Sequence, residues 1–327
     1  MTAKHTIKSV ALKIFPKTLI LRANYLFNNY RKVIWIIGDG RSGTTWVSDL
    51  INHDRKYREM FEPFHPYLVD GMKFMSPHQY IRPDDFNEEV ENIASDVFSG
   101  KFINERVDLN NDSLVYKGLL IKDIFSNLFS YWASLRFNHV MPILLIRNPF
   151  SVAISKHRKR NWDWATDPLC FLNQKFLYED YLFEFEDIIK KISRKNNYIL
   201  NQIVIWSIIN YVPLCQFKEE NIHVCFYEDI FVEPIREMSN VFKYINGCSE
   251  GGDANIALDV IKRPSRVTTS DGNLLSGVSP ILSWKNELTP QLIDEGFEIL
   301  QCFGFEDLYD DKSMPNSDVL KKYFKKE

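Results

Sequence analysis

The sequence has 327 residues and a formal net charge of −3, with 45% hydrophobic and 25% charged residues. This composition excludes wholesale disorder, and the length suits one large domain or two small ones. The weak negative charge does not favour a nucleic-acid partner. The sequence has no run of about 18 apolar residues, so no transmembrane helix is predicted. Its five cysteines are scattered, which is typical of a protein in a reducing compartment.

The first 32 residues carry seven basic side chains and no acidic one. Apolar side chains such as Ile14 and Leu19 are interleaved with these bases, which predicts a basic helical segment over residues 1–32. An ordinary surface helix is the simpler interpretation. The alternative is an amphipathic helix that rests on an anionic membrane. We therefore expect a cytoplasmic protein, either free or peripherally bound to a membrane.

Short apolar runs alternate with helical patterns along the rest of the chain. In chain order, the predicted strands are Val33–Ile37, Tyr57–Phe61, Val115–Ile121, Pro142–Ile146 and His223–Tyr227. The predicted helices are Thr44–Asn52, Ile124–Phe137, Phe150–Arg158, Phe171–Arg194, Tyr198–Lys218 and Ile230–Ile245. Such alternation predicts an α/β fold in three layers, a parallel sheet with helices on both faces.

These elements define one main domain over residues 33–310. Residues 68–114, which are irregular and acidic, are predicted to form a helical insertion or lid. Residues 247–283 are rich in small polar residues and predict a loop around the acceptor or donor of a reaction. Residues 311–327, with four lysines near the end, are predicted to form a solvated tail.

The segment after the first strand, Gly38 to Trp46, predicts an anion-binding loop. Its two glycines and Thr45 fit the nucleotide-binding pattern G-x-x-x-x-G-K-[ST], but Thr44 stands where the lysine belongs. The glycines permit a tight turn, and the following helix supplies N–H donors. Arg41 provides the cation. The missing lysine argues against an ATPase or kinase of the usual kind, although such an enzyme remains the first alternative.

The order Arg41-Ser42-Gly43-Thr44-Thr45-Trp46 resembles the 5′-phosphosulfate loop of sulfotransferases that use 3′-phosphoadenosine 5′-phosphosulfate (PAPS). The resemblance implies their P-loop-like fold, sulfuryl transfer from PAPS to an acceptor, and no metal. It implies that the donor is bound at Gly40, Arg41, Ser42, Gly43, Thr44 and Thr45, with Trp46 stacked on the adenine.

A second motif resembles the 3′-phosphate site of the same family. Arg147-Asn148-Pro149 follows a strand, and Ser155 lies eight residues after Arg147. The basic run 156–160 that follows is either functional or a solvated face. Tyr227-Glu228-Asp229 resembles a family segment near the adenine. The family's Arg-Lys-Gly loop is missing, which leaves Arg263, Ser265 and Arg266 as candidate replacements.

The catalytic residues are assigned by the same resemblance. Arg41 is predicted to face the leaving group, and Lys122 resembles a sulfate-contacting lysine. Phe61-Glu62-Pro63 resembles a segment of carbohydrate-type members, so Glu62, with a raised pKa, is the leading candidate for the base. His65 and Asp123 are the other candidates. A sugar or glycan hydroxyl is the preferred acceptor, and a non-catalytic nucleotide- or glycan-binding module is the second alternative. The oligomeric state stays open.

Overall fold

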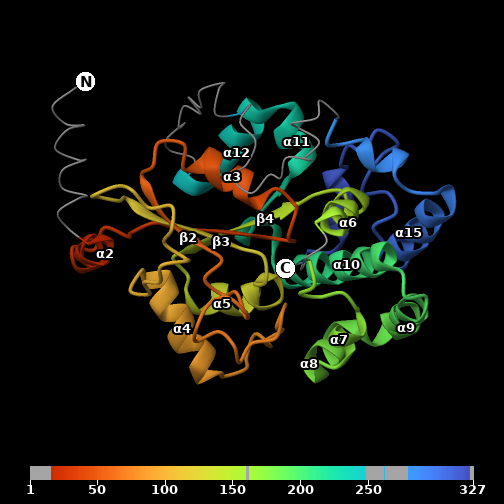
Figure 1. The fold of residues 1–327 in the computed structure, drawn as a ribbon, viewed down its shortest axis with the longest axis horizontal. Coiled ribbons are helices and arrows are strands. Elements are labelled where there is room, and N and C mark those ends of the chain that lie inside the picture. Colours follow the sequence, from red (N-terminus) through yellow and green to blue (C-terminus); the bar gives the residue numbers. More distant parts are fainter. Residues whose placement is uncertain (1–15, 160–161, 248–260, 262–278, 325–327) are drawn as a thin grey trace.

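The computed structural model describes residues 16–159, 162–247, 261 and 279–324 of the chain. Its centre is one sheet of five parallel strands in the order β2-β3-β1-β4-β5 (Figure 1). The strands are β1 Val33–Gly38, β2 Tyr57–Phe61, β3 Gly118–Asp123, β4 Val140–Ile146 and β5 His223–Phe226. All five predicted strands are present. The mostly apolar runs of β1, β3 and β4 are buried on both faces, whereas β2 buries Arg58, which pairs with Asp108 at 2.8 Å.

Helices cover both faces of the sheet, as predicted. On one face lie α3 Thr44–Ile51, α11 Tyr227–Val232 and α12 Pro234–Asn246, packed on Ile34 and Ile36 of β1. The opposite face, which carries Trp35, is covered by α4 Glu88–Ser99, α5 Ser130–Arg136 and α10 Tyr198–Gln216. Figure 1 shows these helices above and below the strands, which confirms a three-layer α/β fold.

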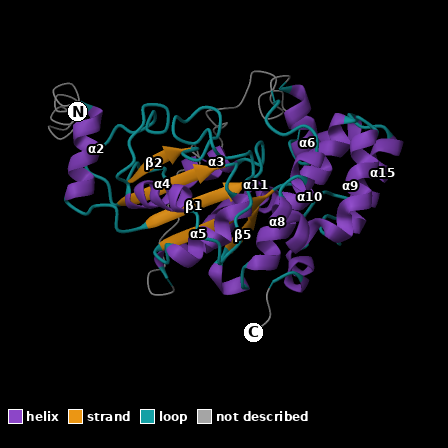
Figure 2. Cartoon of the chain, turned by 90° about the horizontal axis from the view of Figure 1, so that it is seen from below, coloured by secondary structure: helices purple, strands orange, loops and turns teal. Residues whose placement is uncertain are grey.

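The remaining helices lie around this centre. The helix α2 Lys17–Leu26 lies at one end of the molecule, and α6 Pro149–Arg158 and α15 Pro290–Cys302 lie with α10 toward the other (Figure 2). Short 3₁₀ segments occur at Asn127–Phe129, Glu219–Asn221, Ser283–Asn286 and Ser317–Lys322.

Three predicted elements have different bounds in the structure. Strand β3 starts at Gly118, because the N–H of Tyr116 donates to Asn24 and residues 115–117 lie outside the sheet. The predicted helix 230–245 is two helices, and Pro234, which lacks an N–H, starts the second. The predicted helix 124–137 begins as the 3₁₀ segment at Asn127–Phe129 and becomes α-helical only at Ser130.

The predicted long helix 171–194 is broken into pieces. They are α7 Leu169–Leu172, α8 Lys175–Leu177, the π segment Tyr178–Leu182, the 3₁₀ segment Phe183–Phe185 and α9 Glu186–Arg194. The break occurs at Gln174, whose backbone is extended and whose side-chain oxygen accepts the N–H of Tyr80 at 2.8 Å. A tertiary hydrogen bond therefore overrides the local helical preference.

Two segments that were expected to be peripheral belong to the packed structure. In residues 68–114, Val90, Ala94, Val97 and Phe98 of α4 are part of the main core, so this segment is a layer of the fold and not a lid. Residues 311–324 are not a solvated tail. Leu320 is buried there, and the hydroxyl of Ser313 accepts the indole N–H of Trp284 at 3.0 Å.

Among the residues that the structure describes, one helix, α10, is long and apolar enough to cross a membrane by length and composition alone. However, 83% of its apolar window is buried inside the protein. It packs between α6 and α15, which is the position of a core helix.

Candidate functional site

The loop between β1 and α3 has the shape that its glycines require. Gly43 has φ = 94°, and a Cβ there would lie 2.5 Å from Cδ2 of Tyr227. A Cβ at Gly40 would lie 2.0 Å from a ring carbon of Trp162. Arg41 has φ = 72°, a left-handed conformation that is costly for a residue with a side chain. The chain thus maintains a strained loop between two aromatic rings.

Polar groups in this loop fit an anionic ligand. The N-terminus of α3 starts at Thr44 and presents free N–H groups at the loop. The Ser42 hydroxyl and the Trp46 indole N–H are buried and have no hydrogen-bond partner among the described residues. Buried polar groups without a partner are rare, so their presence supports a bound group that supplies acceptors.

The second motif meets the first at the ends of neighbouring strands. Arg147, directly after β4, donates from Nη1 to the carbonyl of Arg41 at 3.0 Å and from Nη2 to the carbonyl of Pro280 at 3.0 Å. Its guanidinium lies 4.2 Å from the ring centre of Tyr227, and its buried Nε has no partner in the described part of the chain. Ser155 accepts from Arg41 Nε at 3.1 Å. The two predicted anion sites are therefore adjacent, and Ser155 lies against Arg41.

A buried ion pair attaches the loop to α6. Lys156 Nζ lies 2.6 Å from a carboxylate oxygen of Asp39 and donates to Gln202 at 2.9 Å. Burial raises the pKa of Asp39 and lowers that of Lys156, while the pairing opposes both shifts. Lys156 thus belongs to the interior, whereas its neighbours His157 to Lys159 are exposed.

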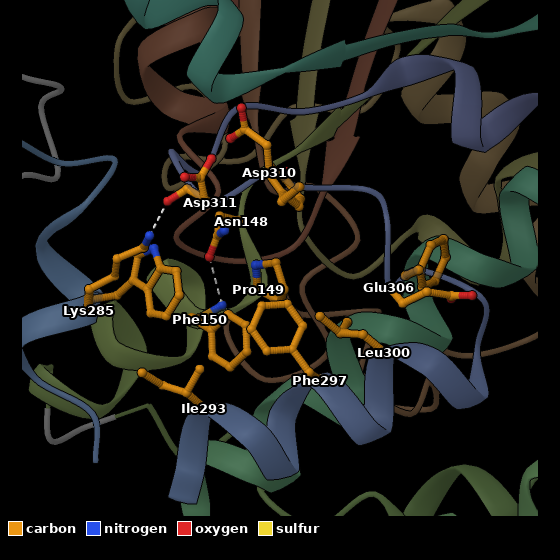
Figure 3. A pocket seen from close by; sticks show the side chains of 13 residues that line it. Asn148, Pro149, Phe150, Lys285, Ile293, Phe297, Leu300, Glu306, Asp310 and Asp311 are labelled. Atoms are coloured by element: carbon orange, nitrogen blue, oxygen red, sulfur yellow. Dashed lines mark hydrogen bonds between the residues drawn. The ribbon is translucent and has the colours of Figure 1, made fainter. Parts of the chain in front are cut away.

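The start of α6 is supported from the other side by the segment Trp284-Lys285-Asn286. The ring of Trp284 stacks on Phe150 with centroids 4.6 Å apart, beside a cavity of about 410 Å³ (Figure 3). In this view Lys285 points to the backbone of Asp311, with which it forms a hydrogen bond. The segment therefore packs against α6, which carries Ser155 and Lys156.

Comparison with known proteins identifies the family. The model of the sulfotransferase domain matches residues 31–263, which span the loop, Arg147 and Tyr227. The chain belongs to the sulfotransferase family. The sulfotransferase is accordingly a PAPS-dependent enzyme, and its fold is that of the family. Membership also removes the kinase alternative, which already lacked its lysine at Thr44.

The solved structures that are similar to this chain are distant in sequence. The sulfotransferase domain from the curacin biosynthetic pathway has 16% identity and a TM-score of 0.43, covering 83% of this chain and 97% of that one. The sulfotransferase from Alicyclobacillus acidocaldarius has 13% identity and a TM-score of 0.41, covering 84% of this chain and 94% of that one. Mouse sulfotransferase SULT7A1 complexed with PAP has 16% identity and a TM-score of 0.41, covering 94% of this chain and 93% of that one. These similarities are too low to place side chains. The curated proteins gave no significant match.

Lys122, the predicted sulfate-contacting lysine, and Glu62, the predicted base, form an ion pair. Phe61 and Lys122 are partners in the β2–β3 register. Glu62 follows Phe61, and its Oε1 lies 2.5 Å from Lys122 Nζ while its Oε2 lies 2.7 Å from Arg106 Nη2. Burial alone would raise the pKa of Glu62, but the two cations outweigh it and lower the pKa. The expectation of a raised pKa is therefore wrong for this arrangement.

His65 is placed as a structural side chain. It is buried against Phe125 and Trp164, and its Nδ1 accepts the N–H groups of Tyr67 and Leu68 at 3.2 and 3.3 Å. In the neutral ring the proton is then on Nε2, so no lone pair is free to take a proton. Burial, followed by the charge of Arg106, lowers the pKa of His65 to about 4. This geometry does not support His65 as the base.

Asp123 has a similar positioning role. It is fully buried and accepts the N–H groups of Phe64 at 3.0 Å and Phe125 at 2.8 Å. Burial raises its pKa to about 6, against the effect of these hydrogen bonds. The carboxylate thus connects the loop after β2 to the end of β3 and fixes the position of Lys122, its neighbour in sequence.

Trp162 was not singled out in the sequence, and Lys159 was named only within the basic run 156–160. Lys159 follows directly after α6, four residues after Ser155, with its Nζ 5.9 Å from the ring centre of Trp162. Partial burial of its ammonium, together with the charges of Arg41 and Lys122, lowers its pKa. The four-residue spacing, which places side chains on one helix face, was the available signal. Trp162 had none. Arg263, Ser265 and Arg266 lie outside the described residues.

Proposed function

We propose that this sulfotransferase transfers the sulfuryl group of PAPS to a hydroxyl group of a sugar or glycan. The observation that carries the proposal is the ion pair of Glu62 with Lys122 beside the donor loop. In this sequence Glu62 lies in Phe61-Glu62-Pro63, the segment that resembles carbohydrate-type members. A carboxylate at this position is ionised at neutral pH and can accept a proton from a hydroxyl.

An aromatic surface beside Glu62 supports a sugar acceptor. Trp162 and Trp164 are partly exposed with ring centres 6.0 Å apart, and Tyr67, which is 52% exposed, lies 5.6 Å from Trp164. Such rings offer an apolar face to the C–H groups of a sugar, with polar atoms at their edges. Because Trp162 also covers Gly40, this surface adjoins the donor loop.

We further propose that Lys122 controls the basicity of Glu62. The ammonium group of Lys122 has three N–H donors, so it can contact a sulfuryl oxygen while it still holds Glu62. The negative charge of the bound donor then lies close to Glu62, which stays buried, and its pKa rises. Donor binding thereby prepares the carboxylate to take the proton of the acceptor.

The chemistry needs few further groups. The donor supplies the sulfuryl group, and PAP leaves with the electron pair of the broken S–O bond while the acceptor oxygen forms the new one. In this proposal, Arg41 and the N–H groups at the start of α3 bind the phosphate on which negative charge grows. Lys159 adds a third positive charge. The acceptor proton goes to Glu62.

The experiment is turnover of labelled PAPS with a panel of glycans and, in parallel, a panel of phenols and alcohols. We expect transfer to glycans, with a loss of about 10²–10⁴-fold in kcat for Glu62→Gln. The matched control is Glu91→Gln, an acid of α4 paired with Arg136 at 3.6 Å, which should not change turnover. Transfer only to phenols or alcohols would refute the sugar acceptor. Unchanged turnover of Glu62→Gln would show that Glu62 is not the base.

A further inference from the structure

An unusual group of exposed apolar side chains lies at the α2 end of the molecule. Leu26 and Phe27 at the end of α2 are each 77% exposed, and Leu19 is 52% exposed. We call Leu19, Leu26 and Phe27, together with Leu109 and Val115, the α2 surface. Exposed apolar side chains that gather at one end of a protein often mark a contact with a membrane or with another protein.

The helix shows why these side chains are not part of the core. Ile20, Leu21 and Asn24 form the buried face of α2. Leu19, Arg22 and Leu26 recur at positions i, i+3 and i+7, so they lie on the opposite face, directed away from the protein. Two of these three side chains are apolar, so α2 carries apolar side chains outside the face that its own fold buries.

A neighbouring loop adds to the same end of the molecule. Lys17 Nζ donates to the carbonyls of Asp108 and Leu109 at 3.1 Å each, and the Asn24 amide donates to the carbonyl of Leu114 at 2.9 Å. These bonds hold residues 108–115 against α2. In that loop Leu109 is 70% and Val115 69% exposed. Figures 1 and 2 both show α2 at the outer end of the sheet, away from α6 and α15.

The charges at this end are mostly positive. Lys17, Arg22 and Arg31 are exposed on or beside α2, whereas Asp112 is the exposed acid of the adjoining loop 108–115. In the sequence, Lys4, Lys8 and Lys13 precede the helix, and no acid occurs among residues 1–32. A surface with apolar side chains surrounded by basic ones complements an anionic lipid bilayer, which offers acyl chains beneath negative headgroups.

We infer that the α2 surface docks the enzyme on an anionic membrane. Leu26 and Phe27 enter the boundary between headgroups and acyl chains, and Arg22 and Arg31 contact the headgroups. Each basic residue near such a surface strengthens binding by about fivefold at low salt. Binding therefore weakens as salt is added. The inference is independent of the acceptor and of the base.

The test is flotation of the full-length protein with vesicles of phosphatidylcholine alone and of phosphatidylcholine with phosphatidylserine. We expect binding only to the vesicles with phosphatidylserine, about tenfold or more weaker for the Leu26→Ser/Phe27→Ser variant. The matched control is Phe183→Ser/Ile235→Ser, at exposed apolar positions outside the α2 surface, which should bind like the native protein. All three proteins should bind PAP equally in a thermal-shift assay, so a failure here is separate from a failure of the proposed function.

Three outcomes would overturn the inference. They are no binding to either vesicle, equal loss in the control variant, or equal binding with and without phosphatidylserine. Sedimentation at increasing protein concentration tests the remaining possibility, in which a second copy of the chain covers the α2 surface. A dimer that the Leu26→Ser/Phe27→Ser variant abolishes, without vesicle binding by the native protein, would show that a second copy of the chain covers the surface.

Discussion

Replacing Lys122 by glutamine separates the role of this residue in stability from its role in catalysis. Lys122 is 3% exposed and forms one of two ion pairs of Glu62, at 2.5 Å. Removing one partner of a buried pair costs about 3–5 kcal/mol. Because Arg106 still holds the other oxygen of Glu62 at 2.7 Å, we expect the lower end of this range, about 3 kcal/mol at pH 7. Urea unfolding measures this loss.

The loss should depend on pH. In the native protein the pKa of Glu62 is lowered, so its contribution to the free energy of unfolding is present above the unfolded pKa and disappears as the pH falls through the folded pKa. Without Lys122, only Arg106 opposes the effect of burial, so the pKa of Glu62 rises from its native value and this contribution shrinks. The difference between Lys122→Gln and the native protein should therefore shrink from pH 7 toward pH 4. A difference that is equal at both pH values would refute the electrostatic reasoning.

The catalytic effect has a different signature. PAP carries no sulfuryl group, so Lys122→Gln should bind PAP like the native protein while kcat falls by about 10²–10³-fold. Lys101→Gln, which removes an exposed pair with Asp96 at 2.8 Å, is the control and should change neither quantity. A loss of PAP affinity as large as the loss of turnover would show that Lys122 binds the nucleotide and not the sulfuryl group.

Three further predictions follow from single contacts. Gly43→Ala should abolish PAP binding in calorimetry, because φ is 94° and the new Cβ would meet Tyr227 at 2.5 Å; retained affinity would contradict the shape of the loop. Lys156→Met should lower the free energy of unfolding by about 3–5 kcal/mol, because Asp39 is left buried and unpaired, and adding Asp39→Asn should restore much of the loss; no restoration would contradict the pairing. Ser313→Ala leaves the buried Trp284 N–H without its acceptor and should cost about 1–3 kcal/mol in the same assay, whereas no change would show that residues 311–324 do not support Trp284.

The sequence was sufficient to predict the fold and the glycine-dependent shape of the loop after β1. Runs such as Val33–Ile37 are apolar at every position, which is the pattern of a strand buried on both faces. Gly40 and Gly43 stand where a side chain would collide with an aromatic ring, so glycine itself was the signal. The prediction of one helix over 171–194 was wrong because the break depends on a hydrogen bond between Gln174 and Tyr80, which lie far apart in the sequence.

The electrostatics of the site could not be read from the sequence. The pKa of Glu62 depends on Arg106, which arrives from an irregular segment 44 residues later and belongs to no motif. His65 seemed a good base because of its ordinary pKa, but only the fold shows that its Nδ1 is occupied by two backbone N–H groups. Local patterns therefore predicted the shape of the loop after β1, whereas long-range contacts decide the protonation of the groups near it.

The most direct test of the account is a crystal structure of the protein with PAP. Arg147 is predicted to contact the 3′-phosphate, and the N–H groups from Ser42 to Thr45 the 5′-phosphate, with Lys122 and Glu62 beyond the latter. A nucleotide bound elsewhere, or one that Arg147 and the loop do not touch, would contradict the site.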